Sequence, residues 1–176
     1  MNSKNFSYLD NLIKNSKRKV TLDCDIILDE SEVAEYKKGI IIDSPITIDG
    51  KGHTVDAGEM LTIMFDIKTR AVAFKNITLK NMKMMESRYL YPDGMGFVLF
   101  AAYQPHHKYY GSLDHSGRVS MENVCIEQGS VEISGGKLVM KNCTCNGTFH
   151  KKFETGGRYH PKDEGVNYKN IKKYPH

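Results

Sequence analysis

The stretch from Ala101 to Gly117 is the richest in side chains that could bind a ligand. Aromatic rings beside polar groups suit the stacking and hydrogen bonding of a sugar, and loops that leave a rigid scaffold often carry function. We therefore interpret this stretch as a contact for a sugar or a protein partner, against the alternative of an inert or packing loop. Its candidate contact residues are Tyr103, His106, His107, Tyr109, Tyr110, Asp114 and His115.

The same stretch raises the alternative of a transition-metal site, because it holds three histidines and an aspartate. Against a metal, the adjacent His106 and His107 cannot easily point the same way in an extended segment. Nor do they form the two-histidine helical pattern of a catalytic zinc site. The four cysteines of the chain include no C-x-x-C pair and are interpreted as small buried hydrophobes. We expect neither a metal ion nor a cofactor.

A shorter stretch, from Glu86 to Gly94, adds two candidate ligand contacts, Arg88 and Tyr89. It ends in Pro-Asp-Gly, which indicates a turn before it indicates any binding role. If this stretch and the longer one lie on the same side of the molecule, they form one ligand surface.

Catalysis has weaker support in the sequence. Paired carboxylates could hydrolyse a polysaccharide, or acidic residues could hold calcium while a basic residue takes a proton. However, Asp49 and Asp56 lie in glycine-bearing turns, where aspartate bonds the local backbone. Arg70 and Arg118 each precede a repeated strand and are expected to be solvated charges on one face. No phosphate-binding loop or nucleophile elbow is present, and we assign no catalytic residue.

These side chains are positioned by an internal repeat. Each copy is apolar, any, apolar, charged, Asn, apolar, any, apolar, so the parity of the apolar residues shifts at the Asn. Because alternate residues of a strand face opposite sides, this shift predicts a corner between two short strands. The three copies cover residues 72–79, 119–126 and 138–145.

The corner residues, Asn76, Asn123 and Asn142, are expected to stack as a structural ladder, their amides bonded from coil to coil. The 19 residues from Asn123 to Asn142 amount to one coil of a solenoid. The 47 residues from Asn76 to Asn123 suit two coils with an insertion. The sequence thus predicts about four to six stacked coils, which leave strand edges open only at the two ends.

The N-terminal end is predicted to be closed by a helix over residues 6–17. Ser7 and Asp10 resemble a capping box at its start. An apolar stripe at helical spacing would then cover the first coil, and its residues are Phe6, Leu9, Leu12 and Ile13.

Composition limits the possible classes of protein. The 176 residues are 40% hydrophobic and 26% charged, with a formal net charge of +4. The lysines are scattered, so we expect no nucleic-acid partner. No apolar run approaches the roughly 20 residues of a membrane span, and the N-terminus carries no signal segment. We expect one domain over residues 1–149 and a basic C-terminal extension or end cap over residues 150–176.

The chain resembles the pectate-lyase-like right-handed parallel β-helix proteins, and within them the adhesin-like surface repeat proteins of microbes. The resemblance covers roughly residues 5–147. It implies an all-β fold, a single-stranded right-handed parallel β-helix with an N-terminal capping α-helix, and a location outside the cell or at its surface. The segments that carry the resemblance are residues 6–9, 46–57, 64–67 and 74–79.

Three functional hypotheses follow. The first is a non-catalytic, adhesin-like module that contacts glycan or protein through one solenoid face and the 101–117 loop. The second, implied by the catalytic members of the family, is a polysaccharide lyase or glycoside hydrolase. The third is a structural or assembly protein that oligomerises through the exposed coil end.

Overall fold

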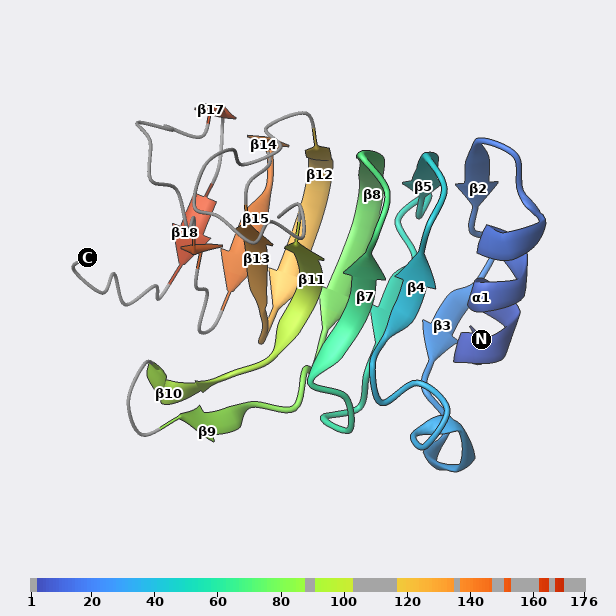
Figure 1. Cartoon of the computed structure of the whole chain (residues 1–176), viewed down its shortest axis with the longest axis horizontal. Coiled ribbons are helices and arrows are strands. Elements are labelled where there is room, and N and C mark those ends of the chain that lie inside the picture. Colours follow the sequence, from blue (N-terminus) through green and yellow to red (C-terminus); the bar gives the residue numbers. More distant parts are fainter. Residues whose placement is uncertain are drawn as a thin grey trace, which may run out of the picture.

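The computed structural model describes residues 3–87, 91–102, 117–134, 137–146, 151–152, 162–164 and 167–169. Across these residues the chain is mainly β, with one α-helix at the N-terminus and two sheets in which every strand pair is parallel (Figure 1). The predictions of a mainly-β chain, parallel sheets and an N-terminal helix are confirmed.

The larger sheet has 11 strands and the smaller one has five. The larger sheet consists of β1 (Ser3–Lys4), β2 (Lys19–Thr21), β3 (Asp25–Ile27), β5 (Ile46–Asp49), β6 (Thr54–Asp56), β8 (Ala71–Lys80), β12 (Arg118–Glu127), β14 (Lys137–Lys141), β15 (Thr144–Asn146), β17 (Lys162–Glu164) and β18 (Asn167–Lys169). The smaller sheet consists of β4 (Ile40–Ile42), β7 (Ile63–Ile67), β11 (Phe97–Ala102), β13 (Ser130–Ser134) and β16 (Lys151–Lys152).

Successive stretches of the chain add strands to the two sheets alternately. Each new strand pairs in parallel with a strand from the preceding stretch in the same sheet. β8 has β5 and β6 on one side and β12 on the other. The expectation of two coils between Asn76 and Asn123 is therefore wrong, because β8 pairs directly with β12. Part of the added length is an antiparallel hairpin, β9 (Met85–Ser87) and β10 (Tyr91–Met95), inserted before β11.

The repeated Asn residues lie where β8 and β12 bend. Asn76 and Asn123 have left-handed backbone, with φ of 49° and 54°, and Asn142 repeats it with φ of 52°. In β8 the buried residues are Val72 and Phe74 before the bend and then Ile77 and Leu79 after it. A left-handed residue turns the chain through a corner, so both halves of the strand bury their apolar side chains.

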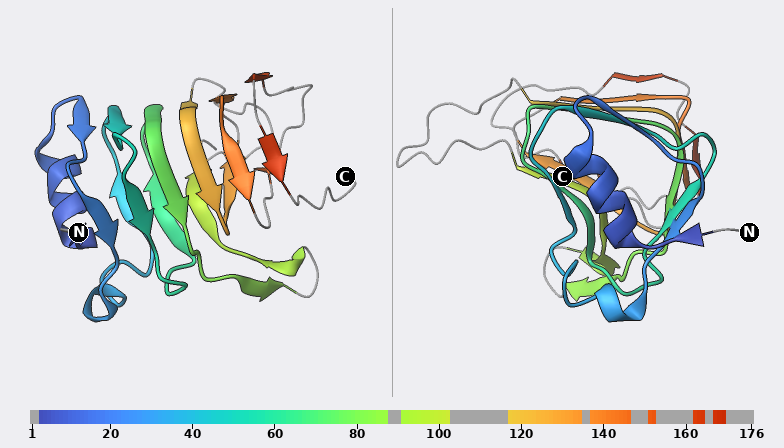
Figure 2. Two further views of the ribbon diagram at one scale, coloured as in Figure 1. Left: turned by 180° about the vertical axis from the view of Figure 1, so that it is seen from behind. Right: turned by 90° about the vertical axis from the view of Figure 1, so that its right-hand side faces the viewer.

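The core lies between the two sheets, which enclose it in the end-on view of Figure 2. Phe65 of the smaller sheet meets Phe74 of the larger one with ring centroids 5.2 Å apart. The packing against the corners is close: a Cβ added to Gly50 would lie 2.6 Å from the Cβ of Ile77. The apolar residues that the repeat pattern placed inward are therefore the ones that join the sheets.

Helix α1 (Phe6–Asn15) covers the N-terminal end of this core (Figure 2). Its buried stripe includes Phe6, Leu9 and Ile13, in agreement with the helical spacing. Its N-cap is Asn5, whose side chain accepts a hydrogen bond from the Tyr8 backbone N–H at 3.2 Å. The capping box expected at Ser7 is therefore wrong.

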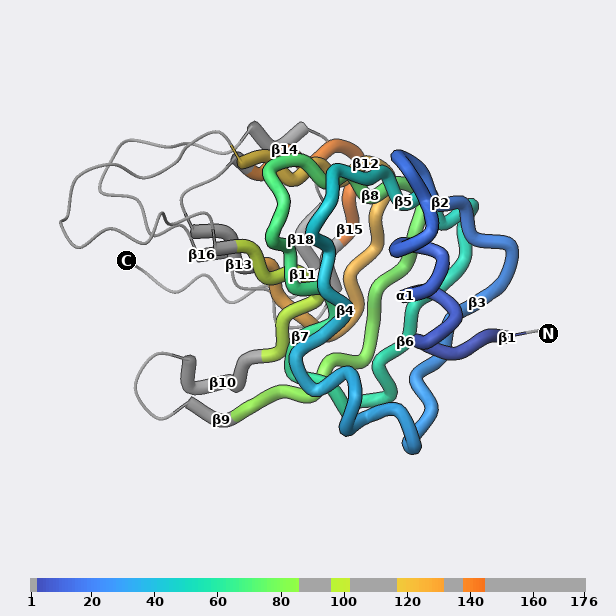
Figure 3. Tube along the Cα trace, turned by 45° about the vertical axis from the view of Figure 1, so that its right-hand side comes forward, coloured from blue at the N-terminus to red at the C-terminus, as the bar shows by residue number. Residues whose placement is uncertain are grey.

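The described residues of the 150–176 segment extend both sheets. β16 pairs with β13, β17 with β14 and β18 with β15, all in parallel. Figure 1 shows β17 and β18 at the opposite end of the sheets from α1, and Figure 3 shows α1 beside β2 and β3. Of the described part of the chain, no helix has the length and apolar character needed to span a membrane.

Candidate functional site

The ligand contacts expected from the sequence lie outside the described residues, so the structure does not place them. They are Arg88, Tyr89, Tyr103, His106, His107, Tyr109, Tyr110, Asp114 and His115. Within the described residues, no group of three or more histidine, cysteine, aspartate or glutamate side chains is arranged to hold a metal ion. The candidate site is therefore built from the outer faces of the sheets.

A surface groove of about 530 Å³ crosses the outer face of the larger sheet. Its floor comes from β5, β8 and β12, which lie in register: Thr47 is opposite Ala73, and Ala73 is opposite Ser120. These three side chains face outward because their neighbours along each strand point into the core. All three are small, so the floor is lower than the long side chains on either side of it.

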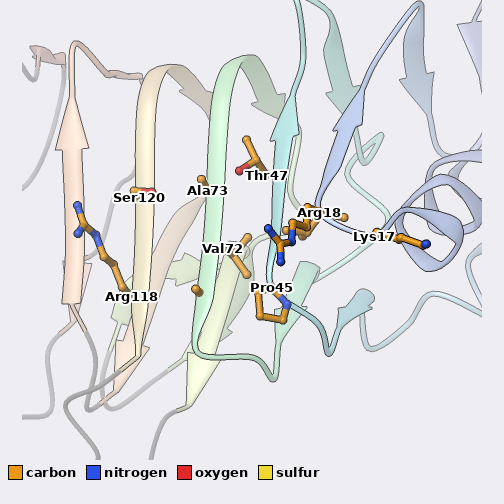
Figure 4. Close-up of a pocket in the computed structure, with 10 residues that line it drawn as sticks. Lys17, Arg18, Pro45, Thr47, Val72, Ala73, Arg118 and Ser120 are labelled. Atoms are coloured by element: carbon orange, nitrogen blue, oxygen red, sulfur yellow. The ribbon is translucent and has the colours of Figure 1, made fainter.

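Basic residues line the two ends of the groove. Figure 4 shows Arg18 at one end and Arg118 at the other, with the three floor residues between them. Lys17 also lines the groove, but its side chain extends away from the floor toward α1 (Figure 4). Arg18 directly precedes β2, and Arg118 begins β12. Among the described residues, no carboxylate lies within ion-pair distance of these three cations.

The strand order fixes the separation of the two arginines. β2, β5, β8 and β12 are successive neighbours, so three inter-strand spacings separate β2 from β12. At about 4.8 Å for each spacing, the two backbones are ~14 Å apart. The groove is therefore a long, shallow surface with a positive charge at each end.

A second row of outward side chains borders the groove and carries both signs of charge. Lys75 Nζ lies 2.8 Å from Glu122 Oε2 within this row. Asp49 of the same row pairs with Lys19, which lies opposite Thr47 and whose Nζ is 3.3 Å from Asp49 Oδ2. The hydrogen bond and charge of Glu122 raise the pKa of Lys75, and those of Lys75 lower the pKa of Glu122. The positive and negative charges of this row compensate each other. The uncompensated positive charge of this face therefore lies at the ends of the groove.

The aspartates considered for catalysis are occupied by backbone and amide donors. Asp49 Oδ1 accepts from the Lys51 N–H at 3.2 Å and from Asn76 Nδ2 at 3.1 Å. Asp56 Oδ1 accepts from the Gly58 N–H at 2.8 Å. The hydrogen bond from Asn76 is the largest influence that lowers the pKa of Asp49. Both carboxylates therefore serve the turns that hold the strands.

The corner asparagines extend this network from strand to strand. Asn76 donates to Asp49, and Asn123 Nδ2 in turn donates to Asn76 Oδ1 at 2.9 Å. The bonded row therefore begins at an aspartate, and it includes two of the three Asn residues of the repeat. These amides bond to one another at the corner rather than lining the groove.

A separate polar pair lies near the N-terminal cap. His53 Nδ1 is 3.1 Å from Asp25 Oδ1, and the same oxygen accepts from the Thr54 N–H at 3.0 Å. The backbone bond from Thr54 is the main cause of the lowered pKa of Asp25. The pair orients a histidine, but it has no serine, threonine or cysteine hydrogen-bonded to the imidazole within the described part of the chain.

Only one pattern in the sequence indicates this groove. Arg70 and Arg118 are neighbours as expected, since the Arg118 N–H donates to the Arg70 carbonyl at 2.7 Å. The basic run before β2 and the small residues at 47, 73 and 120 were missed, because only the register brings them together. Searches against protein-family models, curated proteins and solved structures find no match for this chain.

Proposed function

We propose that the chain is a right-handed parallel β-helix and acts as a non-catalytic, adhesin-like surface module that binds an acidic glycan in the basic groove. The β-helix is supported by the all-parallel sheets, the direct pairing of β8 with β12 and the left-handed corners at the repeated Asn residues. Stacked short strands of this kind are typical of repeat architectures, which present long flat binding faces.

The observation that carries the binding role is the pair of exposed arginines at the ends of the groove. A guanidinium presents a planar fork of donors that matches carboxylate and sulfate oxygens, and two such groups favour an anionic ligand. The hydroxyls of Thr47 and Ser120 offer hydrogen bonds to sugar hydroxyls between them. A shallow, open groove suits an extended chain rather than a small molecule, which prefers an enclosed pocket.

The binding test is retention of the protein on immobilised acidic and neutral polysaccharides, measured with and without calcium. We expect retention on the acidic polymers and its loss as salt rises, because exposed charges are screened within about 10 Å at 0.1 M salt. Arg118→Gln should weaken binding about 10-fold, the effect of losing one charged hydrogen-bonding group. Lys38→Gln is the matched control, since it removes an exposed positive charge that does not line the groove.

The same retention experiment distinguishes binding from catalysis. Soluble sugar product that accumulates with time would identify a lyase or hydrolase and overturn the proposed non-catalytic role. Equal retention of wild type and Arg118→Gln would place binding elsewhere, and Tyr109→Ala and Tyr110→Ala would then test the 101–117 contacts. If no glycan retains the protein, the assembly hypothesis is tested by its oligomeric state at rising concentration.

A further inference from the structure

The distribution of charge along the groove specifies more than an acidic ligand. We infer that the groove selects a polymer whose acidic groups are separated by neutral units, over one that carries an acidic group on every unit. This inference rests on the proposed function and concerns the chemistry of its ligand. It follows from where the cations are, from what lies between them and from the row that borders them.

Among the described residues that line the groove, the cations lie only at its ends. Arg18 and Arg118 are separated by three strand spacings, ~14 Å between backbones. Figure 4 shows the Arg118 side chain extending away from the floor residues, so in this arrangement one small anion does not reach both guanidinium groups and only a ligand that spans the groove uses both arginines. Such a ligand lies across the strands, along the direction in which they stack (Figure 4).

Within the part of the chain that the structure describes, no cation lines the middle of the groove. The floor consists of two hydroxyl side chains and a methyl group, those of Thr47, Ser120 and Ala73. Neutral sugar units would satisfy these groups, because hydroxyls bond hydroxyls and the methyl group packs against a sugar ring. An acidic group placed there would lose part of its hydration without gaining a charged partner, which is unfavourable.

The bordering row strengthens this preference. Asp49 and Glu122 lie two residues beyond Thr47 and Ser120 on the same strands, and on the same outer face. Lys75, between them in register, has its Nζ 2.8 Å from Glu122. Its charge is therefore already compensated within the protein. A carboxylate or sulfate at the middle of the groove would meet a balanced row rather than a free cation.

The test compares two polymers of known charge pattern. Hyaluronan alternates a uronic acid with a neutral amino sugar, and polygalacturonate carries a uronic acid at every unit. Dissociation constants are measured at the same salt concentration and the same concentration of carboxylate. We expect hyaluronan to bind wild type at least about 10-fold more tightly. Equal or tighter binding of polygalacturonate would overturn this inference and leave the proposed function standing. Binding of neither polymer would also overturn this inference, and the proposed function falls with it if no acidic polysaccharide of the binding test retains the protein.

Variants assign the preference to the groove. Arg18→Gln and Arg118→Gln should each weaken hyaluronan binding about 10-fold, while Lys38→Gln should not change it. Ala73→Lys places a cation in the middle, so it should tighten polygalacturonate binding and reduce the preference. Ser120→Lys makes the same change on the next strand, and it serves if Ala73→Lys fails to fold by circular dichroism. A preference unchanged in both lysine variants would contradict the inference.

Discussion

At the scale of single residues, Glu32 joins two distant parts of the chain. Its side chain is buried at 6% exposure and accepts from the backbone N–H groups of Phe6, at 3.2 Å, and Ser7, at 2.9 Å, as well as from the Ser7 hydroxyl. Burial raises the pKa of Glu32, but the hydrogen bonds from Ser7, Asp29 and Phe6 outweigh it and the pKa is lowered. A carboxylate at a helix N-terminus also interacts favourably with the helix dipole.

The first prediction is that Glu32→Gln destabilises the fold by about 1–3 kcal/mol at pH 7, because buried donors lose a charged acceptor. The folded-state pKa of Glu32 is lowered, so its stabilisation is fully present above the ordinary pKa of 4.5 and is lost as pH falls through the folded value. Urea unfolding at pH 7 and pH 3.5 should therefore show a smaller pH dependence in Glu32→Gln than in wild type. Glu35→Gln, an exposed change of the same charge, should resemble wild type.

Asn123 combines a left-handed backbone with an amide bond to Asn76, and two substitutions separate these roles. Glycine at this position keeps the left-handed backbone and loses the amide bond, whereas alanine loses both. The second prediction is that Asn123→Ala is about 1 kcal/mol less stable than Asn123→Gly, since a side chain in left-handed backbone costs roughly 1–2 kcal/mol. Equal urea midpoints for the two variants would show that the corner does not require left-handed backbone.

At the scale of elements, α1 lies across the end of both sheets. It contacts β2 and β3 of the larger sheet and β4 of the smaller one. Asp10 holds the helix to the segment between β3 and β4, since its carboxylate accepts from the Tyr36 hydroxyl at 3.2 Å. It also pairs with Lys14 within the helix at 2.7 Å. The helix therefore protects the N-terminal edges of strands that would otherwise be open to pairing.

The third prediction compares two leucines of α1. Leu9 has 0% exposure, whereas Leu12 is only partly buried. Leu9→Ala should destabilise the protein by about 2–5 kcal/mol through the cavity that it leaves, and Leu12→Ala by clearly less. Thermal or urea unfolding measures both. Similar losses for the two variants would contradict the packing of α1 described above.

The elements also show what a single sequence reveals. The strands at β8, β12 and β14 follow from the apolar parity of the repeat, because burial of one face forces that parity. The N-cap of α1 does not follow from the sequence pattern, because Asn5 and Ser7 both suit a cap. The choice between them depends on Glu32, 25 residues beyond Ser7. The groove does not follow from the sequence pattern either, since outward side chains carry no periodic constraint and their neighbours come from distant strands.

At the scale of the whole molecule, the strands differ in how many neighbours hold them. Among the described strands, β8 and β12 are paired on both sides, whereas β2 pairs only with β5 and β4 only with β7. The fourth prediction is that amide hydrogens of residues 71–80 and 118–127 exchange most slowly, and those of β2 and β4 measurably faster. Hydrogen exchange followed by mass spectrometry tests it. Uniform protection across these strands would show a single cooperative unit instead.

The charged row beside the groove has a consequence for how the chain assembles. In the native order, Asp49 is next to Lys75, Lys75 next to Glu122 and Glu122 next to Lys141. If folding skipped one strand, Asp49 would meet Glu122, or Lys75 would meet Lys141, and like charges would lie directly opposite each other. Strands with nearly identical apolar patterns therefore differ in the sign of this outward charge. The alternating charges disfavour an incorrect strand order during folding.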